Sequence, residues 1–166
     1  RATVSATAPP LFYLRSILDA DRISQSLTGV HKVVILGGGY IGLEMAETFR
    51  LLGHTVTVVE MMPRVVPNFD PSVSLLVQTA LEKNGVELFS GSGVTELDAG
   101  SVALQNGTRI PADLVLVATG VRPSTALATA AGVQLGLTGA IAVSPQMVTN
   151  IPNIYAAGDC AESNHV

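Results

Sequence analysis

The stretch with the clearest chemical meaning contains three closely spaced glycines, Gly37, Gly39 and Gly42, in the pattern G-x-G-x-x-G. In such a pattern the first glycine permits a tight turn out of a strand, and the second lets the backbone approach a pyrophosphate. The third lets the following helix pack closely on the strand. A pyrophosphate would then rest on the helix N-terminus, where unpaired N–H groups and the helix dipole favour anions. The spacing therefore predicts a nucleotide site.

An acidic residue follows at the distance that a ribose-binding group requires. Glu60 lies 18 residues (60 − 42) after Gly42, close to the roughly 20 expected, and its carboxylate can accept hydrogen bonds from ribose hydroxyls. A methyltransferase also carries a glycine turn and an acid after its second strand. Adenosine-type ligands other than NAD therefore remain an alternative.

The elements around the glycines are the ones that must position them. Val33 to Leu36 reads as a strand buried on both faces, and Val56 to Val59 reads as a second one. Between them lies a segment that ends at Gly53, a natural helix C-cap. Its apolar residues recur at helical spacing: Ile41, Met45, Phe49 and Leu52.

A second helix and a third strand follow. Asp70 is the expected N-cap and Pro71 the first helical residue. Asn84-Gly85 closes the helix, and Val86 to Phe89 reads as a strand. The helix has apolar residues spaced to form one face: Val73, Leu76, Val77, Ala80 and Leu81. The resulting βαβαβ order predicts a parallel, Rossmann-like α/β sheet flanked by helices.

The second half of the chain has a different pattern, with short strands in place of alternating strands and helices. Asn106-Gly107 predicts a hairpin, because both residues tolerate positive φ. It lies within an expected antiparallel three-stranded meander laid over the sheet. Around it we expect strands at 94–97, 102–104, 108–110, 113–120, 140–143 and 154–157, short helices at 19–27 and 126–131, and an extended arm at 1–10.

Composition excludes several classes of partner. The net charge of −4 without a basic cluster argues against nucleic acid and against anionic membranes, and no apolar run approaches the roughly 18 residues of a membrane span. One cysteine among 166 residues fits a reducing, cytoplasmic setting. His31, His54 and His165 show no metal-ligand spacing, so no metal is expected.

Four motifs resemble the flavin-dependent pyridine nucleotide–disulfide oxidoreductases, in particular the branch with coenzyme A-disulfide reductases, NADH oxidases and NADH peroxidases. They are GGGYIGLEMAE at 37–47, VTVVE at 56–60, LVLVATGVRP at 114–123 and NIYAAGDCAE at 153–162. In that family an NAD(P)H domain is inserted into a flavin domain. The resemblance implies an arm and short helix from the flavin-domain side at 1–29, an NAD(H)-binding domain at 30–150 and a returning flavin-domain segment at 151–166.

The resemblance also implies roles for individual residues. Tyr40 matches an aromatic that lies over the flavin where nicotinamide enters, and Glu44 would point to the nicotinamide end. Either side chain could instead be an ordinary helix residue. Gly120 matches a glycine that lets the ligand pass the strand end, and Asp159 matches the acid that accepts a flavin ribitol hydroxyl. The full cofactor-binding set is Gly37, Gly38, Gly39, Tyr40, Ile41, Gly42, Glu44, Glu60, Gly120 and Asp159.

The chain departs from the family pattern in ways that bear on function. A first glycine motif for FAD and a redox-active cysteine near it are missing, and Cys160 reads as a small buried thiol. We therefore expect no catalytic residue in this chain and no activity from it alone. The family parent would be a homodimer with FAD and an interface domain, and NADH would deliver hydride to the flavin. Disulfide, oxygen or peroxide would be the final acceptor. A stand-alone nucleotide-binding module and a direct NAD-dependent dehydrogenase remain as alternatives.

Overall fold

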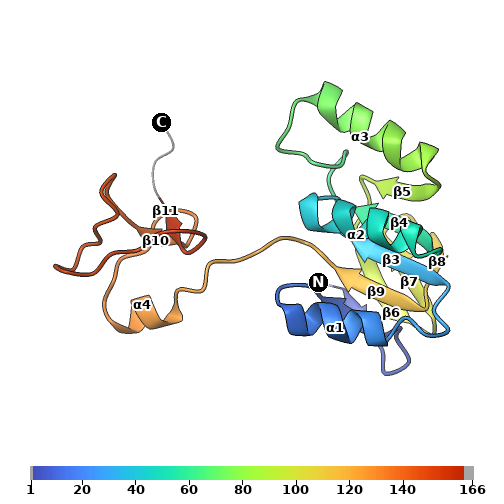
Figure 1. Cartoon of the computed structure of the whole chain (residues 1–166), viewed down its shortest axis with the longest axis horizontal. Helices are drawn as coiled ribbons and strands as arrows, with labels where there is room; N and C mark the ends of the chain where they lie inside the picture. The colour runs from blue at the N-terminus through green and yellow to red at the C-terminus, as the bar shows by residue number, and fades with distance from the viewer. Residues whose placement is uncertain (1, 163–166) are drawn as a thin grey trace. The chain divides into compact units, whose positions relative to one another are not determined.

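The computed structural model describes residues 2–162, which form two compact units that divide between Gly120 and Val121. The first unit carries the glycine motif and is built on a parallel sheet. The second is smaller and has little regular structure (Figure 1). The division of the chain into flavin-side and NAD-side segments that the resemblance implies remains a prediction.

A five-stranded parallel sheet forms the centre of the first unit, in the order β2-β9-β3-β4-β5. Its strands are β2 (Leu11–Tyr13), β9 (Leu114–Val117), β3 (Lys32–Leu36), β4 (Thr55–Glu60) and β5 (Val86–Ser90). The predicted βαβαβ unit supplies β3, β4 and β5, which confirms the expected Rossmann-like architecture. The edge strand β2 directly follows the predicted arm at 1–10, and its parallel pairing with β9 was not predicted.

The three helices of this unit are α1 (Ile17–Gln25), α2 (Tyr40–Leu51) and α3 (Pro71–Lys83). Alternate sheet residues such as Ile35 and Val58 form one apolar core with Phe49 of α2. Helix α1 begins two residues earlier than predicted, because Ser16 and Asp19 cap its N-terminus reciprocally. Within the described residues, no helix is both long and apolar enough to cross a bilayer.

The predicted meander covers the opposite face of the sheet (Figure 1). It consists of β6 (Val94–Asp98), β7 (Ser101–Leu104) and β8 (Arg109–Pro111), which pair antiparallel. The N-terminal arm adds β1 (Thr3–Val4) parallel to β6. The arm is fixed there, because the hydroxyls of Ser5 and Thr7 donate to one oxygen of Asp98, at 2.6 and 2.8 Å.

The hairpin predicted at Asn106-Gly107 is confirmed, since β7 and β8 pair antiparallel on either side of it, but its turn type differs from the expected one. At Asn106-Gly107 only the glycine has positive φ, 85°, so this is not a turn with two left-handed residues. The turn between β6 and β7 has that character instead, with φ of 29° at Ala99 and 72° at Gly100. The turn spans residues 104–107 and closes through a hydrogen bond from the Gly107 N–H to the Leu104 carbonyl, so the glycine is its last residue, where glycine is favoured.

The apolar face predicted for α3 is largely exposed. Leu76 is 70% exposed and Val73 is 37% exposed, whereas the buried residue of this helix is Ser74. The predicted N-cap is correct, since the Asp70 carboxylate accepts the Ser72 N–H at 2.8 Å. Helix α3 packs beside β5, which is the edge strand, so the sheet covers only part of the helix.

The second unit contains α4 (Ala126–Ala130) and a pair of two-residue parallel strands, β10 (Ile141–Ala142) and β11 (Ala161–Glu162). The strand predicted at 154–157 is wrong. In the part of the chain that the structure describes, this stretch contributes only an isolated bridge between Val148 and Tyr155. Turns flank the stretch on both sides, with φ of 65° at Asn153 and 80° at Gly158, so an extended strand cannot continue beyond these four residues.

Candidate functional site

The sheet has its topological switch point between β3 and β9. From β3 the chain continues to β4 on one side, whereas β9 lies on the other side. The glycine motif follows the carboxyl end of β3, and Gly120 follows the carboxyl end of β9. The two connections meet closely, since the Ala118 N–H donates to the Leu36 carbonyl at 2.7 Å. Open α/β sheets bind ligands in the crevice at this position.

Two of the motif glycines are required by the fold itself. A Cβ on Gly37 would lie 2.3 Å from the Ala118 carbonyl oxygen, and φ at Gly37 is 114°. A Cβ on Gly42 would lie 2.0 Å from the Gly37 carbonyl oxygen. Gly39 differs, because a Cβ there would meet nothing within 4 Å and its φ is −85°. Open space at Gly39 is what the approach of a ligand to the backbone requires.

The N-terminus of α2 carries the features of an anion site. Gly39 is its N-cap and provides no side-chain cap, and the first turn contains no acidic residue. Tyr40 and Ile41 in that turn are exposed, at 61% and 39%, whereas Gly42 is buried against the strand. The first N–H groups of the helix thus have no intrahelical acceptor and are free for an anion.

Glu60 lies at the end of β4 and reaches back to the glycine turn. Its side chain is buried, at 9% exposure, and its two oxygens accept separate backbone N–H groups. One comes from Gly38 at 2.6 Å and the other from Met62 at 2.7 Å. A Cβ on Gly38 would lie 2.7 Å from Val65 Cγ1 and 3.3 Å from a Glu60 oxygen, so Gly38 allows this contact. Each oxygen retains acceptor capacity for a ribose hydroxyl.

The loop after β4 packs against the glycine turn, which was not predicted from the sequence. Val65 is fully buried, and the Val66 N–H donates to the Gly38 carbonyl at 2.9 Å. Val66 adopts a φ of 41°, which is unfavourable for a β-branched residue. A Val-Val pair between two prolines in a loop was the available signal, because two adjacent β-branched apolar residues in a turn suggest burial.

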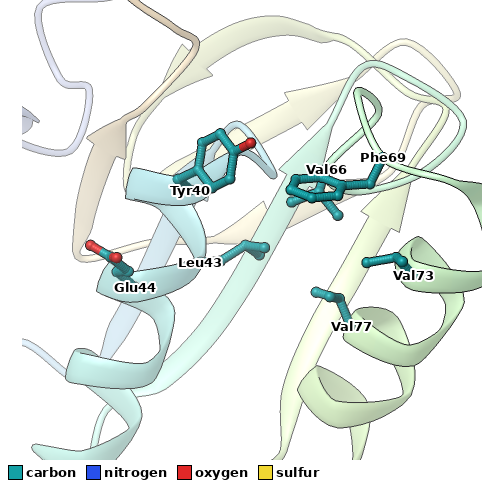
Figure 2. A pocket seen from close by; sticks show the side chains of 7 residues that line it. All are labelled: Tyr40, Leu43, Glu44, Val66, Phe69, Val73 and Val77. Carbon is teal, nitrogen blue, oxygen red and sulfur yellow. The ribbon is translucent and has the colours of Figure 1, made fainter.

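An apolar hollow of about 260 Å³ opens between α2, this loop and α3. The rings of Tyr40 and Phe69 pack edge to face beside it, with centroids 5.9 Å apart and planes at 76°. Figure 2 shows Leu43 of α2 pointing toward Val73 and Val77 of α3 in this hollow. Glu44, one helical turn after Tyr40, is exposed and lines the same hollow, so the structure brings these two predicted residues together.

The remaining predicted residues are Gly120 and Asp159. Gly120 follows β9 with a φ of 106°, which explains the need for glycine. Asp159 belongs to the second unit, where it is exposed in the turn before β11. In the same turn the thiol of Cys160 is half-buried and donates to the Ala157 carbonyl at 3.4 Å. Among residues 2–162, no cluster of three or more His, Cys, Asp or Glu could hold a metal ion.

Glu162 of β11 links this strand to the loop at 136–138 through hydrogen bonds. Its carboxylate accepts the Leu137 N–H at 3.0 Å and the Thr138 N–H at 2.7 Å, and the Thr138 hydroxyl also donates to it. The hydrogen bonds from Thr138 lower the pKa of Glu162 below its ordinary value, and the Leu137 N–H contributes to this. A Cβ on Gly136 would collide with this carboxyl group, so the loop at 136–138 is shaped around it.

Comparison with known proteins gives consistent results. A family model described as pyridine nucleotide-disulphide oxidoreductase matches residues 2–166. An NADH oxidase of Methanocaldococcus jannaschii is 40% identical over 92% of this chain and 35% of its own length. A rubredoxin-NAD(+) reductase of Ectopseudomonas oleovorans is 39% identical over 90% of this chain and 40% of its own length. The structure of an NAD-dependent persulfide reductase from A. fulgidus is 39% identical, with a TM-score of 0.88 over 93% of this chain and 30% of that one. The chain thus spans well under half of the length of these relatives.

Proposed function

The chain belongs to the pyridine nucleotide-disulphide oxidoreductase family, and on that premise we propose that it is the NAD(H)-binding domain of a flavoprotein oxidoreductase. The observation that carries the proposal is the contact between Glu60 and the glycine turn. It holds the Glu60 carboxylate 2.6 Å from the backbone nitrogen of Gly38, directly before an uncapped helix N-terminus, which supports a role in binding ribose.

The residues present fit a dinucleotide. The pyrophosphate would bind the N–H groups at the start of α2, and the open space beside Gly39 would admit it. Glu60 would accept hydrogen bonds from the hydroxyls of the adenosine ribose. The other half of the ligand would then run past Tyr40, which follows Gly39 directly. These contacts bind and orient NADH, and the chemistry of hydride transfer lies outside them.

The flavin half of the proposal depends on the second unit. FAD, when bound in the parent, supplies the two-electron acceptor for the hydride of NADH. Asp159 is exposed, and its carboxylate could accept a hydrogen bond from the ribitol chain of the flavin. The partners of this chain would be the flavin and interface domains of a homodimeric, cytoplasmic parent, with no nucleic acid or membrane. The names of the relatives indicate different electron acceptors. For this protein we propose a disulfide, oxygen or peroxide as the final electron acceptor.

Titration of the 166-residue chain with NADH by calorimetry tests the proposal. The matched variants are Gly39→Ala, which adds a methyl group in open space, and Glu47→Gln, which removes an exposed charge farther along α2. Gly39→Ala is expected to fold normally and to weaken NADH binding at least about tenfold, which corresponds to about 1.4 kcal/mol. Glu47→Gln should bind as the wild type does. If neither the wild type nor the variants bind NADH, the proposal fails.

A further inference from the structure

Phe69 closes a ring of contacts that begins and ends at the glycine turn. The Val66 N–H donates to the Gly38 carbonyl at 2.9 Å, and the Phe69 N–H donates to the Val66 carbonyl at 3.0 Å. The Phe69 ring then packs on Tyr40, which lies two residues after Gly38. A residue that is remote from the motif in sequence is thereby held against the first residue of α2.

The rings of Tyr40 and Phe69 shield each other from solvent. Tyr40 is 61% exposed and Phe69 is 42% exposed, and their edge-to-face geometry is the one that aromatic pairs prefer. Apart from these two rings, the hollow beside them is lined by aliphatic side chains and by Glu44, so it offers Tyr40 no other aromatic surface (Figure 2). Without Phe69, the exposed Tyr40 side chain would be free to change rotamer.

The backbone that holds Phe69 is specified by the fold. Val66 keeps its left-handed conformation although it is β-branched, which requires compensation from its surroundings. Its N–H and carbonyl are both hydrogen-bonded, its side chain is buried, and Val65 beside it is fully buried. The loop is thus built to place Phe69 at this spot.

We propose that Phe69 is a positioning residue, which orders the ring of Tyr40 for contact with the half of the dinucleotide that lies beyond the pyrophosphate. This inference rests on the proposed function, because it takes the start of α2 as the pyrophosphate site. Glu60 fixes the adenosine ribose on one side of that site. Tyr40 is the exposed ring at the helix start, so the nicotinamide half is the part that it would meet. A side chain that is ordered before binding avoids an entropic cost on binding.

The first test measures the order of Tyr40 directly. The chain has three tyrosines, Tyr13, Tyr40 and Tyr155, and no tryptophan, so labelling with 3-fluorotyrosine gives three ¹⁹F signals that single Tyr→Phe replacements assign. Phe69→Leu should shift the Tyr40 signal toward that of a mobile, solvent-exposed tyrosine and leave the other two unchanged. Phe69→Tyr keeps the ring and should preserve the wild-type Tyr40 signal, with a fourth signal from the introduced tyrosine beside the original three. A Tyr40 signal that is the same in Phe69→Leu as in the wild type would overturn the proposal.

The second test separates the two halves of the ligand. ADP-ribose has the adenosine, the pyrophosphate and the second ribose but lacks nicotinamide. Phe69→Leu should bind ADP-ribose as the wild type does and should bind NADH roughly two- to tenfold more weakly, the effect of ordering one side chain. Phe69→Tyr should restore NADH binding. An unchanged or increased ratio of NADH to ADP-ribose affinity would refute the positioning role. Failure of the wild type to bind either ligand would refute the proposed function itself.

Discussion

Replacement of Glu60 by glutamine should destabilise the domain even without a ligand. In the structure both carboxylate oxygens accept backbone N–H groups, from Gly38 at 2.6 Å and from Met62 at 2.7 Å. A glutamine side chain has one oxygen and one NH₂ group, so one of the two N–H groups would face a donor instead of an acceptor. The site is buried, and water therefore cannot easily replace the lost acceptor.

The expected cost is that of one hydrogen bond to a charged group, about 1.5–3 kcal/mol. For a chain of this size, that corresponds to a fall in Tm of about 3–12 °C. Thermal unfolding followed by circular dichroism measures the change, with Glu47→Gln as the control for loss of an exposed charge. If Glu60→Gln melts within 1 °C or so of the wild type, the two backbone contacts do not contribute as described here, and Glu60 is free of the glycine turn.

Three further predictions concern the fold and the isolated chain. Gly42→Ala should lower the unfolding free energy by about 1–3 kcal/mol, because its Cβ would meet the Gly37 carbonyl; chemical denaturation measures this, and wild-type stability would contradict it. The backbone N–H groups of His31 and Lys32 lower the pKa of Asp113. The ionised Asp113 should therefore stabilise the folded state fully above pH 3.8, the ordinary pKa, and this stabilisation should be lost as the pH falls through the lower pKa of the folded state. Because Asp113 is exposed, Asp113→Asn should cost less than about 1 kcal/mol at pH 7 and nothing in strong acid, and an equal cost at both pH values would exclude this linkage. Finally, the purified chain should be colourless and should not oxidise NADH in an absorbance assay, whereas turnover with a disulfide in the absence of flavin would favour a direct dehydrogenase.

The parts of the fold that the sequence predicted well are those with local causes. The requirement for glycine at position 42 follows from a close contact with the Gly37 carbonyl within one strand–turn–helix unit, and at position 37 the positive φ of 114° is a local cause. The close approach of Ala118 to Gly37 is a long-range contact in addition. The N-cap at Asp70 and the strand ends also depend on near neighbours. Local steric and hydrogen-bonding preferences therefore sufficed to predict the glycine turn, the helix after it and the position of Glu60.

The errors arose where long-range packing decides. Periodicity showed that Val73 and Leu76 share a face of α3, but it could not show that the helix would lie over an edge strand and leave that face exposed. The pairing of β2 with β9 joins residues about a hundred positions apart, and no local pattern specifies it. The contact of Glu60 with the Gly38 N–H and the packing of Phe69 on Tyr40 were not predicted for a related reason, because both depend on how β4 and the loop after it lie against the glycine turn.

One cation near the site bears on the choice between NADH and NADPH. Arg64 lies four residues after Glu60, in the loop that folds over the glycine turn. Hydrogen bonds from Ser72 lower the pKa of Asp70, and the charge of Arg64 adds a smaller effect in the same direction. Arg64 is therefore a nearby positive charge that could offset part of the repulsion between Glu60 and a 2′-phosphate.

The central claim is that Glu60 binds the adenosine ribose of NADH, and parallel calorimetric titrations of the wild-type chain with NADH and NADPH test it most directly. The 2′-phosphate of NADPH would remove one ribose donor and place a dianion beside the Glu60 carboxylate. We predict that NADH binds at least about tenfold more tightly, a difference of about 1.4 kcal/mol. Equal affinities, or tighter binding of NADPH, would contradict the account, because they would mean that Glu60 does not face the ribose.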